Sequence, residues 1–280
     1  MTMRQVSLPD GTPVPALGLG TWRFGESKSQ RRADVAAVRR ALELGYRLID
    51  TAEMYGEGGA EEVVGQALPE SGVPRDDVFI VSKVYPHNAS RRGAVAACER
   101  SLQRLRVDRI DLYLLHWRGS HPLADTVAAM QELQAAGRIG HWGVSNFDTD
   151  DLRELAAIDG GCAANQVYCS LSERGVQFEL LPWMNARRMP MMAYSPIDQG
   201  ALSAESLLAD IGRAHGATAA QVALAWVLAL PGTLAIPKAG QERHLRENLD
   251  ALDLVLTSED LARLDQRFPP PTRKRPLAMT

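Results

Sequence analysis

Apolar residues along this chain fall into short continuous runs that alternate with longer stretches carrying a single apolar stripe. The runs have the length and the bounding residues of buried strands, and they end near residues 20, 51, 84, 116, 145, 168, 196 and 239. In the stretches between them, apolar residues recur three and four positions apart, which is typical of amphipathic helices. The pattern therefore predicts strands and helices in regular alternation.

The predicted elements follow one another with little chain left over. The strands are expected at 17–22, 46–51, 78–83, 110–116, 139–145, 163–168, 189–195 and 234–238. The helices are expected at 31–44, 60–68, 91–105, 123–136, 149–158, 178–187, 205–215, 219–230, 241–252 and 258–268. Asp148 or Thr149 is expected to cap the helix that begins at 149. Segments 5–8 and 13–15 predict a β-hairpin with Asp10 and Gly11 at its turn.

Eight strand-and-helix units in succession favour a closed (β/α)8 TIM barrel. We expect this barrel to form one domain over residues 1–280, with an N-terminal β-hairpin and extra C-terminal helices. An open, doubly wound sheet is the alternative. It is disfavoured because Gly18-Leu19-Gly20-Thr21 lacks the third glycine of the dinucleotide-binding fingerprint and opens no helix.

Composition narrows the class of protein. The 280 residues are 45% hydrophobic and carry a net charge of -3, so nothing indicates a nucleic-acid partner. No apolar run reaches the ~18 residues of a membrane span, and the N-terminus does not resemble a signal peptide. Cys98, Cys162 and Cys169 have no C-x-x-C spacing, which argues against disulfides and zinc. We therefore expect a cytoplasmic protein without a bound metal, and a solvated basic end at 273–275.

Polar residues that could take part in catalysis lie where successive strands end. Asp50, Lys83 and His116 directly follow apolar runs, and Tyr55 lies on the loop after the first of these runs. Taken singly, each residue has a structural explanation. Asp50 could be a turn residue and Lys83 a solvated side chain. His116 could be a hydrogen-bonded structural residue, and Tyr55 could simply pack. Because the carboxyl ends of the strands form the active face of a barrel, the four together are expected to converge in one site.

Such a set suits the protonation of a developing alkoxide. A phenol has an ordinary pKa of about 10, which a neighbouring ammonium lowers. A carboxylate beside the lysine keeps it charged, and a histidine can donate a hydrogen bond to a carbonyl oxygen. The set predicts reduction of an aldehyde or ketone by hydride from a nicotinamide cofactor.

Short motifs in the same order identify a family. They are Gly18-Leu19-Gly20-Thr21-Trp22, Asp50-Thr51-Ala52-Glu53-Met54-Tyr55-Gly56, Ser82-Lys83-Val84, Leu114-Leu115-His116-Trp117, Gly143-Val144-Ser145-Asn146-Phe147, Asn165-Gln166-Val167, Ala193-Tyr194-Ser195-Pro196, Ile236-Pro237-Lys238 and Glu247-Asn248. With these motifs the chain resembles the aldo-keto reductases over essentially its whole length. The resemblance implies a catalytic tetrad of Asp50, Tyr55, Lys83 and His116, with Tyr55 as the general acid.

The resemblance also implies NADPH as cofactor. The implied cofactor-binding residues are Gly20, Thr21, Trp22, Asp50, Ser145, Asn146, Gln166, Tyr194, Ser195, Lys238, His244, Glu247 and Asn248. Among them, the hydroxyl and amide groups of 145, 146 and 166 would hold the nicotinamide carboxamide. Tyr194 would stack on the nicotinamide ring and Ser195 would approach the pyrophosphate. Lys238 would meet the adenosine 2′-phosphate, and Glu247 and Asn248 the adenine.

Two positions depart from the pattern of many relatives. Ala239 and His244 stand where those relatives carry a serine and an arginine. A histidine cannot give the bidentate phosphate contact of an arginine, so NADH is possible beside NADPH. The same departures resemble a bacterial subgroup that includes methylglyoxal reductases.

The segments that shape the substrate pocket in this family are short here. Only 117–121 separates His116 from Pro122, the loop after Tyr194 is brief, and 269–280 is all that follows the last predicted helix. We expect an open pocket in which His116, Trp22, Met54 and Trp117 meet the substrate, with Phe24 in its wall. The two tryptophans are equally well explained as packing residues. An open aromatic mouth suits small aldehydes and α-dicarbonyls.

The sequence therefore predicts a monomeric, NADPH-dependent reductase of small aldehydes and methylglyoxal-like α-dicarbonyls. One alternative is a nicotinamide-binding regulatory subunit that senses redox state with little turnover. Another is a barrel aldolase that uses Lys83 as a Schiff-base lysine. The neighbouring Asp50 disfavours the aldolase because it keeps the lysine charged.

Overall fold

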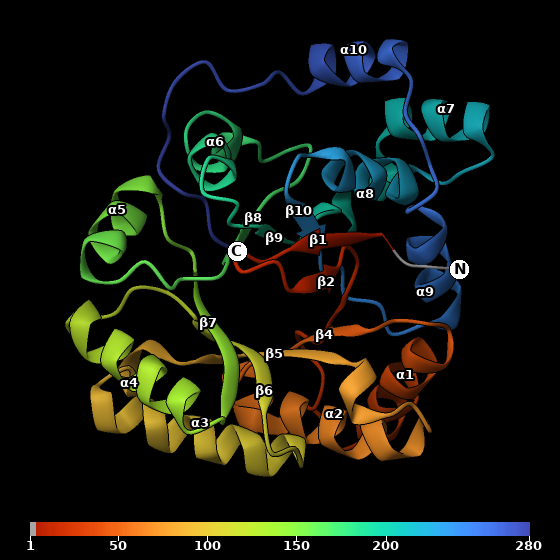
Figure 1. The fold of residues 1–280 in the computed structure, drawn as a ribbon. Coiled ribbons are helices and arrows are strands. Elements are labelled where there is room, and N and C mark those ends of the chain that lie inside the picture. Colours follow the sequence, from red (N-terminus) through yellow and green to blue (C-terminus); the bar gives the residue numbers. More distant parts are fainter. Residues whose placement is uncertain (1–3) are drawn as a thin grey trace.

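The computed structural model describes residues 4–280, in which eight parallel strands form one sheet with the sequence order kept in space (Figure 1). The strands are β3 (Leu19–Gly20), β4 (Leu48–Asp50), β5 (Phe79–Val84), β6 (Ile110–Leu115), β7 (Ile139–Ser145), β8 (Asn165–Tyr168), β9 (Met191–Tyr194) and β10 (Thr233–Ala235). From β4 onward, each strand of this sheet pairs in parallel with the strand that precedes it in the chain, as helical crossovers require.

The sheet closes on itself. Parallel bridges join Leu17 to Ala235 and Gly20 to Lys238, so the first strand meets the segment of the last. The Gly20 N–H donates to the Pro237 carbonyl at 3.1 Å, and a Cβ at Gly20 would lie 2.6 Å from the Ile236 oxygen. Only glycine allows this close approach. The predicted (β/α)8 barrel is confirmed, and the open sheet is excluded.

Helices surround the barrel (Figure 1). They are α1 (Arg31–Glu43), α2 (Gly59–Glu70), α3 (Arg91–Leu105), α4 (Leu123–Ala135), α5 (Thr149–Ile158), α6 (Leu180–Asn185), α7 (Ser206–His215), α8 (Ala219–Ala229), α9 (Glu242–Asp250) and α10 (Ser258–Arg267). Short 3-10 helices are η1 (Tyr55–Gly58), η2 (Arg75–Asp77), η3 (Pro86–Asn88), η4 (Gly175–Gln177) and η5 (Asp198–Ala204). Helices α9 and α10 follow the last strand, which confirms the extra C-terminal helices.

Most predicted elements lie within one or two residues of their observed bounds, and the larger differences have local causes. Helix α2 runs past Pro69 to Glu70, because a proline in the last turn removes one donor without ending the helix. Strand β10 ends at Ala235, since Pro237 has no N–H for the ladder. The cap of α5 is Asp148, whose carboxylate accepts from the N–H groups of Asp150 and Asp151.

An antiparallel hairpin covers the amino end of the barrel. It consists of β1 (Gln5–Ser7) and β2 (Pro13–Pro15), joined by a turn in which Gly11 has φ 94°. Leu8 and Val14 pack with Leu48 and Leu112 in a core cluster inside the barrel. The predicted hairpin is confirmed, and it leaves the opposite end of the barrel free for a site.

Within residues 4–280, no helix combines the length and the apolar character needed to cross a bilayer. Cys98, Cys162 and Cys169 are free thiols, and all three are buried.

Candidate active site

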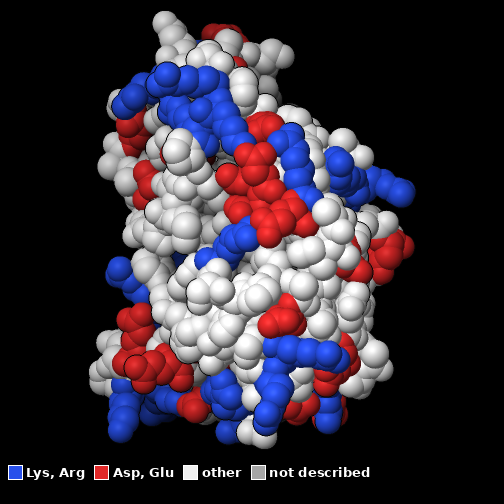
Figure 2. Space-filling view, turned by 90° about the vertical axis from the view of Figure 1, so that its left-hand side faces the viewer, with Lys and Arg blue, Asp and Glu red and all other residues white. Residues whose placement is uncertain are grey.

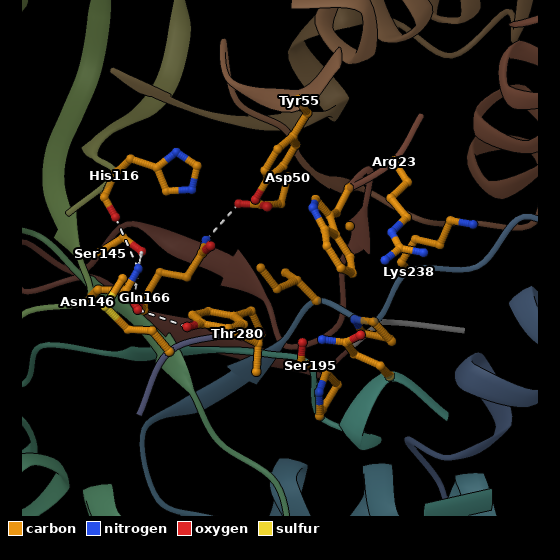
Figure 3. Close-up of a pocket in the computed structure, with 18 of the residues that line it drawn as sticks. Arg23, Asp50, Tyr55, His116, Ser145, Asn146, Gln166, Ser195, Lys238 and Thr280 are labelled. Atoms are coloured by element: carbon orange, nitrogen blue, oxygen red, sulfur yellow. Dashed lines mark hydrogen bonds between the residues drawn. The ribbon is translucent and has the colours of Figure 1, made fainter. Parts of the chain in front are cut away.

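A cavity of about 380 Å³ lies at the carboxyl end of the barrel (Figure 3). It contains most of the residues that the sequence predicts for a site. Its walls are Gly20, Trp22, Arg23, Asp50, Met54, Tyr55, His116, Trp117, Ser145, Asn146, Gln166, Tyr194, Ser195, Pro196, Ile197, Gln199, Gly200, Ile236, Pro237, Lys238, Met279 and Thr280. Lys83 lies directly beneath this surface, in contact with Asp50 and Tyr55.

Asp50 and Lys83 form a buried ion pair beneath the cavity. Asp50 is the last residue of β4 and Lys83 lies near the end of β5, with side-chain exposures of 2% and 0%. The Lys83 Nζ donates to Asp50 Oδ1 at 2.9 Å, to Oδ2 at 2.8 Å and to the Thr51 carbonyl at 2.9 Å. The ammonium is thus held between the Asp50 carboxylate and the Thr51 carbonyl.

Burial and the contact between the two side chains shift the pKa values of this pair in opposite directions. Burial alone would lower the pKa of Lys83, but the charge of Asp50 raises it above its ordinary value. Burial raises the pKa of the Asp50 carboxyl, and the Lys83 ammonium opposes that rise. Both carboxylate oxygens accept from one nitrogen, so the ionised form of the pair accounts for the geometry.

Tyr55 is presented by the turn η1. Its hydroxyl lies 3.3 Å from Lys83 Nζ, which donates to it. The turn needs three consecutive left-handed residues, Gly56, Glu57 and Gly58, of which two are glycine. Burial raises the pKa of the Tyr55 phenol, and the Lys83 ammonium offsets only part of that rise. The Lys83 ammonium lowers the phenol pKa as the sequence analysis expects, but burial raises that pKa by more.

His116 follows β6 and completes the predicted group of four. Its ring stands edge-on to Tyr55, with centroids 5.6 Å apart, and contacts the ring of Trp117 at 4.8 Å. Burial lowers the pKa of His116 well below its ordinary value, so the imidazole is neutral at neutral pH. Within residues 4–280 its buried Nδ1 has no hydrogen-bond partner. An orphaned acceptor costs less than an orphaned donor, which places the proton on Nε2.

Hydroxyl and amide groups form the wall next to His116. The Ser145 hydroxyl donates to the Gln166 carbonyl at 2.9 Å, and Asn146 Nδ2 donates to the His116 carbonyl at 3.1 Å. Asn146 Oδ1 accepts from the Tyr194 hydroxyl at 2.9 Å. Gln166 Nε2 donates to Asp50 Oδ1 at 2.7 Å. This wall is therefore joined to the ion pair by hydrogen bonds (Figure 3).

The remaining predicted cofactor residues divide into two groups. Gly20, Trp22, Tyr194, Ser195 and Lys238 line the cavity. Outside its lining lie Thr21, His244, Glu247 and Asn248.

The group outside the cavity lining makes contacts of its own. Thr21 is buried and its hydroxyl donates to the Asp50 carbonyl at 2.9 Å, so it holds the backbone of that strand end. Glu247 accepts from Arg243 at 2.8 Å and from His244 at 3.0 Å.

The mouth of the cavity is aromatic and partly exposed. Trp22 and Met54 are 37% and 41% exposed, and Trp117 packs against Tyr85 with ring centroids 5.1 Å apart. Phe24 does not belong to this wall. It is buried in the core, where the Lys238 ammonium lies 5.1 Å from its ring, so the expectation for Phe24 is wrong.

A second buried ion pair supports the Tyr55 turn from below. Glu61, in the first turn of α2, is 0% exposed and accepts from Arg104 Nε at 2.6 Å. It also accepts from the hydroxyl of Ser82 at 2.5 Å, next to Lys83 on β5. The Arg104 side chain packs so closely on Gly58 that a Cβ there would meet it at 2.5 Å. The turn and the lysine strand are thus held by one carboxylate.

Acidic residues of α5 form ion pairs with two segments that lead to the mouth of the cavity. Arg118, next to Trp117, pairs with Asp151 at 3.1 Å and with Glu154 at 2.7 Å. Lys274, on the C-terminal segment, pairs with Asp150 at 2.6 Å. Figure 2, which faces this side of the molecule, shows acidic side chains gathered together with basic ones along their border. Lys274 is therefore part of an ion-pair network.

The sequence did not predict several residues of the cavity wall. They are Arg23, Pro196, Ile197, Gln199, Gly200, Ile236, Pro237, Met279 and Thr280. The segment after Tyr194, expected to be brief, reaches α7 at Ser206 and contains η5, whose backbone is left-handed at Asp198, Gln199 and Gly200. The sequence analysis did not predict η5. The C-terminal segment reaches the cavity at Met279, which no local motif indicates.

The geometry suits carbonyl reduction. A phenol that keeps its proton at neutral pH and a neutral imidazole donor face one cavity, and a buried ammonium lies behind the phenol. Within the described part of the chain, no group of three or more His, Cys, Asp or Glu side chains is arranged to hold a metal ion.

Comparison with known proteins agrees with this geometry. The sequence pattern of the Aldo/keto reductase family matches residues 16–267. Methylglyoxal reductase YeaE of Escherichia coli (strain K12) is 49% identical over 286 residues and covers 100% of both chains. Glyoxal reductase of Bacillus subtilis (strain 168) is 36% identical over 261 residues, covering 93% of this chain and 91% of that protein.

A solved structure extends the comparison to three dimensions. The crystal structure of an aldo-keto reductase from Klebsiella pneumoniae in complex with NADPH is 48% identical. It covers 100% of both chains with a TM-score of 0.95. The resemblance to bacterial methylglyoxal reductases, expected from the sequence, is confirmed. The chain is an oxidoreductase that belongs to the aldo/keto reductase family.

Proposed function

We propose that this protein reduces small aldehydes and α-dicarbonyls, such as methylglyoxal, to alcohols with NADPH as the reductant. The observation that carries the proposal is the contact of Tyr55 with the buried Lys83–Asp50 pair, at a cavity that also receives a neutral His116. Residues 4–280 supply every side chain that the reaction needs. We therefore infer that one copy of the chain, acting as a single domain, is sufficient.

The residues of the cavity fit a nicotinamide cofactor. The wall at Ser145, Asn146 and Gln166 offers hydroxyl and amide groups, which match a carboxamide that both donates and accepts. The Tyr194 ring lies beside this wall, and its planar face suits an aromatic ring. A reduced nicotinamide supplies the hydride when it is bound.

Tyr55 is the proposed proton donor. As the hydride reaches the carbonyl carbon, negative charge develops on the carbonyl oxygen, and the Tyr55 hydroxyl transfers its proton to that oxygen. Burial keeps the phenol protonated beforehand, since it raises the pKa of Tyr55. The Lys83 ammonium, 3.3 Å away, stabilises the phenolate that remains. Asp50 keeps that lysine charged and in position.

His116 orients the substrate. A neutral imidazole with its proton on Nε2 donates one hydrogen bond to the carbonyl oxygen without adding a charge to the cavity. This bond strengthens as the oxygen becomes negative, so it stabilises the transition state more than the bound substrate.

The proposed substrate class follows from the mouth. Trp22, Met54 and Trp117 offer mainly apolar contact at an open mouth, which suits a small substrate. Small carbonyl compounds fit such a mouth with low discrimination. The names of the Escherichia coli and Bacillus subtilis relatives, methylglyoxal reductase and glyoxal reductase, support the same class.

The choice of NADPH rests on Lys238. Its side chain is exposed at the edge of the cavity, and no carboxylate within residues 4–280 pairs with it. His244 is occupied with Glu247, so it adds less to a phosphate contact than an arginine would. The Klebsiella pneumoniae relative, solved with NADPH, supports this choice.

The two alternatives have less support. A Schiff-base lysine must be neutral to attack, whereas contact with Asp50 raises the pKa of Lys83. A regulatory subunit with little turnover has no use for a proton donor set against a buried ammonium.

The deciding experiment is NADPH oxidation, followed at 340 nm, with methylglyoxal and a panel of simple aldehydes. We expect turnover with both, and a loss of ~10²–10⁴-fold in kcat for Tyr55→Phe. Tight NADPH binding without turnover of any carbonyl would favour the regulatory alternative. Full activity of Tyr55→Phe would remove the tyrosine from the mechanism.

A further inference from the structure

A second carboxylate lies on the loop that carries Tyr55. Glu53 stands two positions before that tyrosine, and its side chain is 9% exposed. Its Oε1 accepts from the Tyr85 N–H at 2.7 Å and from Asn88 Nδ2 at 3.0 Å, and its Oε2 lies 3.6 Å from Arg100. The proposed proton and hydride steps do not use this carboxylate.

The two bonds to Oε1 join the loop after β4 to the segment after β5. Tyr85 directly follows β5 and precedes η3, the short helix that contains Asn88. Hydrogen bonds to an ionised acceptor are stronger than neutral ones, and burial shields these two from water. The Glu53 N–H also donates to the Lys83 carbonyl at 3.4 Å. The main chain and the side chain of one residue therefore hold the two segments together.

The segment that Glu53 holds supports the loop that carries Trp117. The Tyr85 ring meets the Trp117 ring edge-on, with 5.1 Å between the centroids and 64° between the planes. Further along this loop, a Cβ at Gly119 would lie 2.8 Å from the Cβ of Pro86, so the two backbones are closely packed. Trp117 lines the cavity, whereas Tyr85 lies behind it, outside the cavity lining. Tyr85 is thus a support for the wall and not part of the wall.

We propose that Glu53 is a positioning residue that sets where the Trp117 ring stands in the mouth of the cavity. It acts through Tyr85, whose backbone it holds. Since Met54 and Tyr55 follow Glu53 on the same loop, one carboxylate joins two sides of the mouth. The contact of Trp117 with the substrate belongs to the proposed function, on which this inference rests. The control of that contact by Glu53 and Tyr85 is new.

The position of Trp117 affects substrate binding more than the chemical step. The indole contacts the substrate and the transition state alike, so its displacement raises KM and leaves kcat nearly unchanged. In Glu53→Ala the Tyr85 N–H loses its acceptor. We expect KM for methylglyoxal at saturating NADPH to rise ~10-fold, as for the loss of an apolar contact, with kcat within about 2-fold of wild type.

Glu53→Gln is the matched control. Glutamine keeps an oxygen for both bonds that Oε1 accepts, and it loses only the charge that faces Arg100. The Arg100 side chain is 48% exposed, so that contact contributes little. The KM of Glu53→Gln should therefore stay within about 2-fold of the wild-type value.

A double-mutant cycle separates positioning from a general loss of stability. Trp117→Ala alone should raise KM ~10-fold. Adding Glu53→Ala should then raise it by less than about 2-fold further, because the ring that Glu53 positions is absent. Tyr85→Leu removes the supporting ring and keeps the N–H, and it should behave like Glu53→Ala with and without Trp117. This variant decides the question if Glu53→Ala does not fold.

Hydrogen exchange, followed by mass spectrometry, tests the same contact without turnover. Segment 117–121 should exchange its amide hydrogens faster in Glu53→Ala than in the wild-type protein, because its support is loosened. In Glu53→Gln the exchange of this segment should match that of the wild-type protein.

Three results would overturn the proposal. They are a KM that is unchanged in both Glu53→Ala and Tyr85→Leu, increases in KM that multiply in full with that of Trp117→Ala, and unchanged exchange of 117–121 in Glu53→Ala. A wild-type protein that turned over no carbonyl compound would refute the proposed function. The exchange experiment would still decide whether Glu53 holds the loop of Trp117.

Discussion

Replacing Lys83 with methionine tests how the buried ion pair is balanced. Methionine has nearly the length of lysine but no charge, so the Asp50 carboxylate, 2% exposed, would keep only the Gln166 amide as a side-chain donor. Removing one member of a buried pair costs about 3–5 kcal/mol. Unfolding entropy of about 2.1 cal/mol/K per residue converts this, for 280 residues, into a melting temperature lower by about 5–9 °C.

The loss of stability in Lys83→Met should be larger at high pH than at low pH. Without Lys83, burial raises the folded-state pKa of Asp50 above its unfolded value of about 3.9. An acid whose folded pKa is raised destabilises the fold above its unfolded pKa, and the loss grows until the pH passes the folded value. The deficit of Lys83→Met relative to wild type should therefore be at least halved on going from pH 8 to pH 5.

Thermal unfolding by circular dichroism, without cofactor, measures both effects. The control is the double variant Lys83→Met with Asp50→Asn, in which no charge remains buried. It should recover roughly 2–5 °C, because residues in direct contact couple by about 1–3 kcal/mol. A deficit that is the same at pH 5 and pH 8, or a double variant no more stable than Lys83→Met, would refute the reasoning.

Three further outcomes are expected. Between about pH 6 and about pH 9, kcat/KM should stay constant, because burial lowers the pKa of His116 and raises that of Tyr55; a limb near pH 6.5 that disappears in His116→Asn would contradict this. Lys238→Met should raise the dissociation constant of NADPH ~10–100-fold and leave NADH nearly unchanged, whereas equal losses would remove Lys238 from the phosphate site. Glu61→Gln, which breaks a buried pair, should destabilise the fold by about 3–5 kcal/mol in urea unfolding. Its control Glu62→Gln, which breaks an exposed pair, should destabilise it by less than ~1 kcal/mol. Similar losses in the two variants would contradict the importance of the buried pair.

The barrel could be predicted because its signal is local and repeated. Helix α3 and strand β7 were expected at their observed bounds, since each has an uninterrupted pattern between clear stop signals. Errors occur where a single residue changes the outcome. Pro237 shortens β10, and Pro69 is tolerated at the end of α2.

The group of four could be predicted because each member is tied to a strand end. Parallel strands bring their carboxyl ends together whatever the loops do, so Asp50, Lys83 and His116 converge. The pKa of Tyr55 could not be predicted, because the degree of burial is a property of the whole fold. The bond between Gln166 and Asp50 crosses the barrel, and no pattern in either segment indicates it.

The walls of the cavity escaped prediction for a related reason. Segment 195–205 and the C-terminal segment contain no periodic apolar pattern, and their positions depend on distant partners. Asp198 accepts from the Tyr168 and Ser172 hydroxyls, and Lys274 pairs with Asp150. Such contacts become visible only when the chain is folded.

The ion pairs between α5 and the segments at the cavity mouth have a consequence for how such an enzyme can diversify. The chemical groups stand on the rigid ends of strands, whereas Trp117 and Met279 stand on segments fixed by exposed ion pairs at Arg118 and Lys274. Exposed pairs contribute only about 0–1 kcal/mol each, so changes in these segments cost little stability. The shape of the cavity mouth can therefore change by substitution in two outer segments while the buried group beneath the cavity stays in place. One barrel can thus present differently shaped mouths over the same buried ion pair.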